Sequence, residues 1–156
     1  MLKSILIFIA LVIGGSTFSA ARSPQSEIPN PVRTEVWSEM LSGVLEDVRG
    51  ATPQLPVAIE KASDKAGEMA LKPGLDKRQQ SAAFLVSTLL GWYATELQKA
   101  SLTDADKVAW RTRRVEVAKL IAGLRVLIGD AVVRKSWDNL VGAARVLGLP
   151  EASFID

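Results

Sequence analysis

Residues 76–100 read DKRQQSAAFLVSTLLGWYATELQKA, and their apolar side chains recur every three or four residues. That spacing predicts an α-helix with a buried face, because a helix completes one turn in about 3.6 residues. Leu85 and Trp92 widen the apolar stripe beyond a single face. The segment therefore predicts a central helix that other helices cover. Its stripe consists of Ala82, Val86, Leu89, Leu90, Tyr93 and Leu97.

Four further segments have the same helical periodicity, and none shows the alternating pattern of a strand. Capping residues, glycines and prolines bound them. The helix predicted at 57–71 has a thin apolar face built mainly of alanine, so we expect it to be the loosest element. Five helices with short connections favour a compact, mostly antiparallel bundle of the all-α class. The further helices are predicted at 34–49, 57–71, 103–128 and 130–147.

The N-terminal residues predict export. Lys3 precedes an unbroken apolar stretch at 5–13 and small residues follow it, which is the anatomy of a signal peptide over residues 1–21. Cleavage is expected before Arg22, with the bond after Ser19 as the alternative. The apolar stretch is shorter than the ~20 residues of a spanning helix. An uncleaved leader that anchors the protein in the inner membrane stays open as the alternative.

Residues 22–33 hold three prolines and predict an extended linker. The bundle is expected over residues 34–149, followed by a C-terminal tail, 150–156. The chain has 156 residues, which suits a single domain after a leader. Because it contains no cysteine, its stability cannot depend on disulfide bonds. Among periplasmic and secreted settings, this favours a Gram-negative periplasm.

Charge and composition exclude several classes of function. The formal net charge is +2, too small for the broad basic surface of a nucleic-acid-binding protein. Histidine and cysteine are both absent, which removes the commonest general base, the thiolate nucleophile and the usual transition-metal ligands. We expect no cofactor and no metal, and the composition leans away from an enzyme.

The helix predicted at 103–128 is apolar on two sides. Its broader arc, between Trp110 and Ile128, belongs to the core, and a narrower stripe lies nearly opposite. A helix with two apolar sides must cover both. Either neighbouring helices of the same bundle cover the second stripe, or it is a docking face for a partner helix or a second copy. The stripe consists of Val108, Val115, Ala122 and Val126, flanked by Arg111 and Lys119.

The same helix contains the run WRTRR at residues 110–114. Arg111, Arg113 and Arg114 could together clamp a phosphate or a carboxylate, because each guanidinium group can donate two parallel hydrogen bonds. Such a clamp would suit an acidic partner. The alternative is a solvated flank of the helix, in which Arg113 pairs with nearby carboxylates such as that of Glu116.

Acidic residues four apart offer another possible site. Glu35 and Glu39 share one helical face, as do Glu60, Asp64 and Glu68. Such carboxylates could bind a hard cation or act as an acid and base pair, but this spacing is more typical of a solvent-exposed face. The tryptophans are interpreted as core residues, with a ligand pocket as the alternative. They are Trp37, Trp92, Trp110 and Trp137.

These features predict an exported, non-enzymatic helical protein that acts through protein-protein interaction, of the broad kind that includes inhibitors, immunity proteins and periplasmic adaptors. We expect a protein partner, for which an acidic surface is one option, or self-association. A membrane-tethered scaffold with an uncleaved leader is one alternative. A carboxylate-dependent hydrolase or a carrier of a small apolar ligand is another. The predicted partner-binding residues are Val108, Arg111, Arg113, Arg114, Val115, Lys119, Ala122 and Val126.

Overall fold

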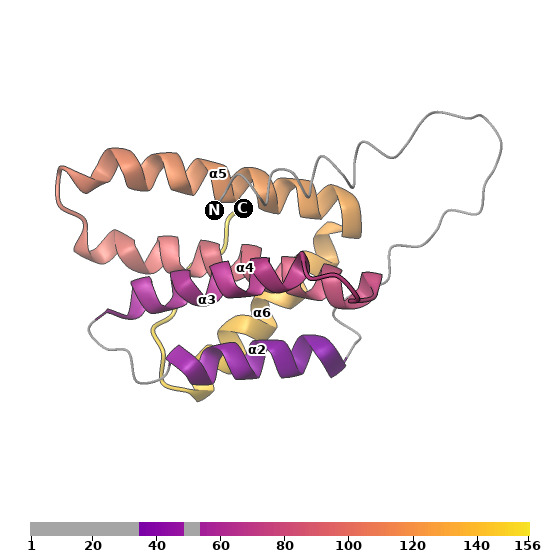
Figure 1. Ribbon diagram of the computed structural model, residues 1–156. Helices are drawn as coiled ribbons and strands as arrows, with labels where there is room; N and C mark the ends of the chain where they lie inside the picture. Colours follow the sequence, from indigo (N-terminus) through magenta and orange to yellow (C-terminus); the bar gives the residue numbers. More distant parts are fainter. Residues whose placement is uncertain (1–34, 49–53) are drawn as a thin grey trace, which may run out of the picture.

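The computed structural model describes residues 35–48 and 54–156. These residues form five α-helices and one short 3-10 helix, with no strand among them, so the predicted all-α class is confirmed. In Figure 1, α4 and α5 form an antiparallel hairpin, α3 lies along α4, and α6 crosses behind them. The elements are α2 (Glu35–Val48), α3 (Leu55–Ala70), α4 (Lys77–Gln98), η2 (Lys99–Ser101), α5 (Asp106–Ile128) and α6 (Asp130–Val146).

Helix α4 is the central element, as its sequence predicts. Every residue from Ala82 to Thr95 is buried, and α4 contacts α2, α3 and α5. Asp76 caps its first turn. The Asp76 carboxylate accepts hydrogen bonds from the backbone N–H groups of Arg78 and Gln79, each at 2.8 Å, and the Gln79 side chain accepts one from the Asp76 N–H at 3.0 Å. This reciprocal cap fixes where the helix begins.

Helix α3 packs more closely than its sequence predicts. The expectation of a loose element is wrong, because the contact between α3 and α4 is the most extensive between any two described helices. Small side chains let the backbones approach: a Cβ atom at Gly91 of α4 would lie 3.3 Å from Ser63 Oγ. The helix also begins two residues early, because Pro56 fits a first turn, where its missing N–H loses no bond. Its buried residues are Leu55, Ile59, Ala62, Ser63, Ala66, Gly67 and Ala70.

The C-terminal residues 150–156 pack back onto the bundle without regular structure. Two buried hydrogen-bond donors of α4 bind backbone carbonyl groups of these C-terminal residues. The indole Nε1 of Trp92 donates to the Ser153 carbonyl at 2.9 Å, and the Tyr93 hydroxyl donates to the Pro150 carbonyl. Both rings are fully buried, so these carbonyls satisfy polar groups inside the core. The tail is thus part of the packed structure.

A single aromatic side chain anchors this tail. Phe154 stacks on Trp137 of α6, with ring centroids 5.0 Å apart and planes 21° apart. The guanidinium group of Arg125 lies 5.2 Å from the centre of the Phe154 ring and donates to the Ile155 carbonyl at 2.6 Å. The tail therefore joins α4, α5 and α6 at one place.

Several predictions concern residues outside the described part of the chain. The signal peptide at 1–21, the linker at 22–33 and residue 34, where the first helix is predicted to begin, lie there, and so do the side chains of Glu35, Trp37 and Glu39. Among residues 35–48 and 54–156, no helix combines the length and the apolar character needed to cross a membrane. The choice between a cleaved and an uncleaved leader stays a prediction.

Candidate functional site

The second apolar stripe of α5 faces away from the rest of the described bundle. Val108, Val115 and Val126 are 70%, 52% and 86% exposed, and Ala122 is exposed as well. The opposite arc of the helix is buried, as predicted for its core side. Neighbouring helices of the described bundle therefore do not cover the stripe. The buried arc consists of Val117, Leu120, Ile121 and Leu124.

The two basic residues that flank the stripe are exposed as well. Arg111 and Lys119 are both exposed, one turn to either side of Val115. The two acidic residues of α5, Asp106 and Glu116, line a groove beside this stripe. We call the exposed stripe and its two bases the α5 outer face. Within helix α5 this face has only basic charge.

The run at residues 110–114 does not form a clamp. Arg113 points into the bundle and pairs with a carboxylate, as the alternative predicts, but this carboxylate is Glu60 of α3 and not Glu116 of its own helix. Arg114 donates to Glu96 of α4 at 3.0 Å. Periodicity along α5 could not reveal either partner, because each acid is on another helix. The structure therefore brings only Arg111 of the three arginines to the outer face.

Arg114 also lies between two indole rings. Its guanidinium carbon is 5.0 Å from the ring centre of Trp92 and 5.7 Å from that of Trp110. Such contacts are favourable because the ring faces carry negative charge density. The Trp110 Nε1 donates to the Thr95 carbonyl at 2.7 Å, which holds the ring against α4. These contacts fix the first half of α5 on the hairpin.

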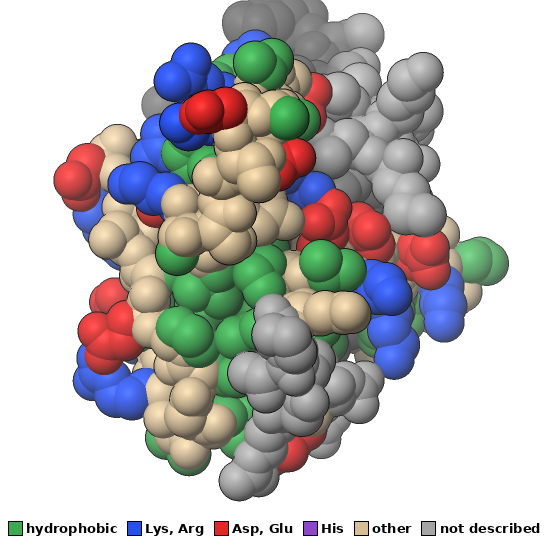
Figure 2. Space-filling view, turned by 90° about the vertical axis from the view of Figure 1, so that its left-hand side faces the viewer, with side chains coloured by type: hydrophobic (Ala, Val, Ile, Leu, Met, Phe, Trp, Pro, Cys, Tyr) green, Lys and Arg blue, Asp and Glu red, His purple; other side chains and the backbone are tan. Residues whose placement is uncertain are grey.

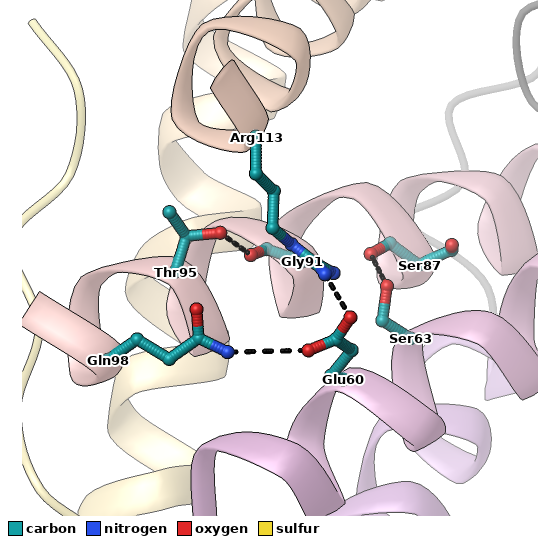
Figure 3. Close-up of polar contacts among 7 residues, drawn as sticks. All are labelled: Glu60, Ser63, Ser87, Gly91, Thr95, Gln98 and Arg113. Atoms are coloured by element: carbon teal, nitrogen blue, oxygen red, sulfur yellow. Dashed lines mark hydrogen bonds and ion pairs between the residues drawn. The ribbon is translucent and has the colours of Figure 1, made fainter. Parts of the chain in front are cut away.

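Figure 3 shows a polar layer between α3, α4 and α5. Glu60 lies at its centre and accepts from Arg113 of α5 and from Gln98 of α4, the latter at 3.3 Å. Beside this pair, the Ser63 hydroxyl donates to the Ser87 carbonyl at 2.7 Å. Three helices are therefore linked by side-chain bonds that cross their apolar packing. This layer holds α5 in a defined orientation.

A small cavity of about 20 Å³ adjoins the layer, between Ser63, Asp64, Ser87 and Arg113. Ser87 Oγ and Arg113 Nε are buried there and have no hydrogen-bond partner among the residues that the structure describes. Burial raises the pKa of the Asp64 carboxyl group, and the neighbouring Glu60 carboxylate raises it further. The space is too small for an organic substrate.

A larger groove of about 600 Å³ lies beside the first half of α5. Its two carboxylates, Asp106 and Glu116, are ten residues apart on one helix, which separates them by about 15 Å along the axis. They do not converge on one point, so the groove does not supply the acid and base pair of a hydrolase. The groove is lined by Gln98, Ser101, Leu102, Asp106, Ala109, Trp110, Thr112, Arg113 and Glu116.

Figure 2 looks onto the end of the bundle that carries the α4–α5 turn. Basic and acidic side chains are interspersed there around hydrophobic ones, and neither sign of charge dominates. An extended basic surface of the kind that binds nucleic acid is not visible on this side of the molecule. The view therefore agrees with the low net charge of the chain.

The remaining candidate residues are accounted for mainly by packing. Trp92 and Trp137 are buried, which confirms their interpretation as core residues, and Trp110 is half-buried. No group of three or more acidic side chains among residues 35–48 and 54–156 is arranged to hold a metal ion. No protein-family model, curated protein or solved structure matches the chain. Its function must therefore be argued from its own surface.

Proposed function

We propose that this is an exported, non-enzymatic protein that acts by binding a protein partner through the α5 outer face. The observation that carries this proposal is the exposure of Val108, Val115 and Val126 along one side of a helix whose other side is core. A contiguous exposed apolar patch that polar residues border is typical of an interaction site. Exposed apolar area is also what a partner can remove from water to gain affinity.

The charge of the face narrows the kind of partner. Arg111 and Lys119 border the stripe, whereas Glu116, the acidic residue between them in the sequence, lines the neighbouring groove. A partner surface with carboxylates beside its apolar residues would meet opposite charge here, which favours correct orientation and faster association. We therefore propose that the partner presents an acidic, partly apolar surface to α5.

The rigidity of α5 supports binding without a large ordering cost. Pairing of Arg113 with Glu60 and of Arg114 with Glu96 ties the helix to α3 and α4. A preorganised face loses little conformational entropy when a partner covers it. The absence of histidine and cysteine from the sequence supports a role in binding and not in catalysis.

Aspartate substitutions test the proposed face. Val126→Asp is informative because Val126 is 86% exposed, so a charge there leaves the core intact. Val146→Asp is the matched control, because Val146 is 85% exposed on α6. We expect Val126→Asp, and likewise Val115→Asp, to abolish co-purification of partners from native cells, whereas Val146→Asp retains them. Circular dichroism should show the same helix content in all three variants.

Equal recovery of partners by Val126→Asp and Val146→Asp would exclude the α5 outer face as the binding site. Export has a separate test, namely the intact mass of the protein purified from its native cells. The sequence predicts a chain that begins at Arg22. A mass that includes Met1 would instead support the alternative of a tethered scaffold.

A further inference from the structure

The exposed positions of α5 follow a regular 4-3-4-3-4 spacing. This is the spacing of the core positions of a coiled coil, in which two helices pack along their length. All six positions are exposed, whereas the residues Val117, Leu120, Ile121 and Leu124 on the other side of the helix are buried. We call them the α5 seam. It consists of Val108, Thr112, Val115, Lys119, Ala122 and Val126.

The seam has the size and shape to receive one helix. It extends over nineteen residues, from Val108 to Val126, and the eighteen steps between them correspond to about 27 Å of helix axis. Its side chains are short except for Lys119, so a partner backbone can approach closely. A loop or a flat sheet would meet these positions at irregular intervals, whereas a helix meets them at each turn.

We propose that the partner element is a single acidic, amphipathic α-helix that packs lengthwise on the α5 seam. The inference rests on the proposed function and names the partner's structure and charge. Lys119 decides the charge, because it lies among the valines and alanine of the seam. Covering its ammonium group without a counter-charge would be costly. A carboxylate facing Lys119, and another near Arg111, would remove that cost.

A second copy of this chain fits the seam poorly. If two seams packed in parallel, each Lys119 would face the other Lys119. If they packed antiparallel about the seam's midpoint, the two Lys119 side chains would still lie about one turn apart. Glu116 borders the seam on the side of the groove, so Lys119 is the charge that two copies would bury against each other at the seam positions themselves. Like charge therefore opposes self-association and favours a different, acidic chain.

Site-specific photo-cross-linking of the full chain tests the shape of the partner. A benzophenone side chain is placed in turn at Val108, Val115 and Val126, with Val146 of α6 as the control, and the cross-linked residues are mapped by mass spectrometry in native cells. We expect cross-links from the three seam positions to fall on one partner segment. Their spacing there should be about seven and then about eleven residues, as for a helix lying along α5. The Val146 position should give none.

A synthetic peptide with the sequence of the mapped segment tests the charge. Lys119→Glu should weaken its binding at least tenfold, while Lys119→Met should weaken it less, because methionine leaves no charge to repel the acids. Exchanging the facing acid of the peptide for lysine should restore binding to Lys119→Glu. Equal affinity of the parent and Lys119→Glu for the peptide would overturn the charge complementarity.

The outcomes separate this inference from the proposed function. Cross-links that map to a basic segment, to a loop, or to a second copy of the chain would overturn the acidic helix while leaving the α5 outer face as a binding surface. Failure of all three seam positions to cross-link to any protein would overturn both. Cross-links in which Val108 and Val126 reach two different proteins would also contradict a single docked helix.

Discussion

The strongest stability prediction concerns the C-terminal anchor, Phe154. Phe154→Ala removes a ring that stacks on Trp137 at 5.0 Å and lies under the guanidinium group of Arg125 at 5.2 Å. It leaves the backbone of the tail in place, so the carbonyl groups that bind the core donors remain available. The substitution therefore measures the anchor alone.

The expected decrease in the free energy of unfolding is the sum of three contributions. An aromatic pair contributes about 0.5–1.5 kcal/mol beyond its buried area, and an exposed cation-π contact about 0.5–1 kcal/mol. Phe154 is only half-buried, so its apolar burial contributes roughly 1 kcal/mol, less than the value for a fully buried phenyl group. The free energy of unfolding should fall by about 2–3 kcal/mol, a large part of the ~5–15 kcal/mol that holds a typical domain folded.

Urea unfolding followed by circular dichroism measures this loss as a shift of the midpoint at constant slope. Val146→Ala is the control, since an 85% exposed side chain should change stability by less than about 0.5 kcal/mol. Deleting residues 150–156 should cost more than Phe154→Ala, because Trp92 Nε1 and the Tyr93 hydroxyl then lose their acceptors at about 1–3 kcal/mol each. If the deletion left stability unchanged, the tail would not be part of the packed structure.

Three further measurements address other contacts. Gly129→Ala should destabilise the protein by about 1–2 kcal/mol, because a φ of 94° strains any residue other than glycine. Gly123→Ala, on α5 with open space around it, should instead stabilise the protein by roughly 0.5–1 kcal/mol. Urea midpoints of the two variants that moved in the same direction would contradict this. Tyr93 is the only tyrosine, and burial raises its pKa to about 12, so tyrosinate absorbance in the folded protein should rise near pH 12 but near pH 10 in urea. Since the unfolded chain ionises first, this group's stabilising effect is complete below about pH 10 and is lost as the pH rises to about 12. A double-mutant cycle of Arg113→Met and Glu60→Gln should give a coupling of about 1 kcal/mol, and additive effects would show that the pair contributes nothing.

Helix positions were predictable from the sequence because apolar periodicity and capping act locally. The cap at Asp76 and the break at Gly129 depend on neighbouring residues only, and the structure places helix boundaries close to them. The C-terminal tail was not predictable in this way. Its contacts depend on backbone carbonyls and on one ring, Phe154, and neither has a periodic pattern.

Contacts between side chains on different helices could not be predicted from the sequence either. Arg113 and Glu60 are 53 residues apart, so their pairing depends on how closely α3, α4 and α5 approach one another. That approach depends in turn on small residues such as Gly91 and Ser63, because their short side chains leave room for the neighbouring helix. A thin alanine face indicates weak packing when the helix is considered alone and close packing once its neighbour is in place.

Folding alone gives little reason for the valines on the outer side of α5. An exposed valine in a helix loses side-chain freedom and forms the helix less well than alanine, lysine or glutamate. At Val108 and Val126, which are 70% and 86% exposed, little apolar surface is buried in return. The buried arc around Ile121 already supplies the contact that holds α5 to the bundle. Burial of these valines by another helix would supply the free energy that folding of this chain does not.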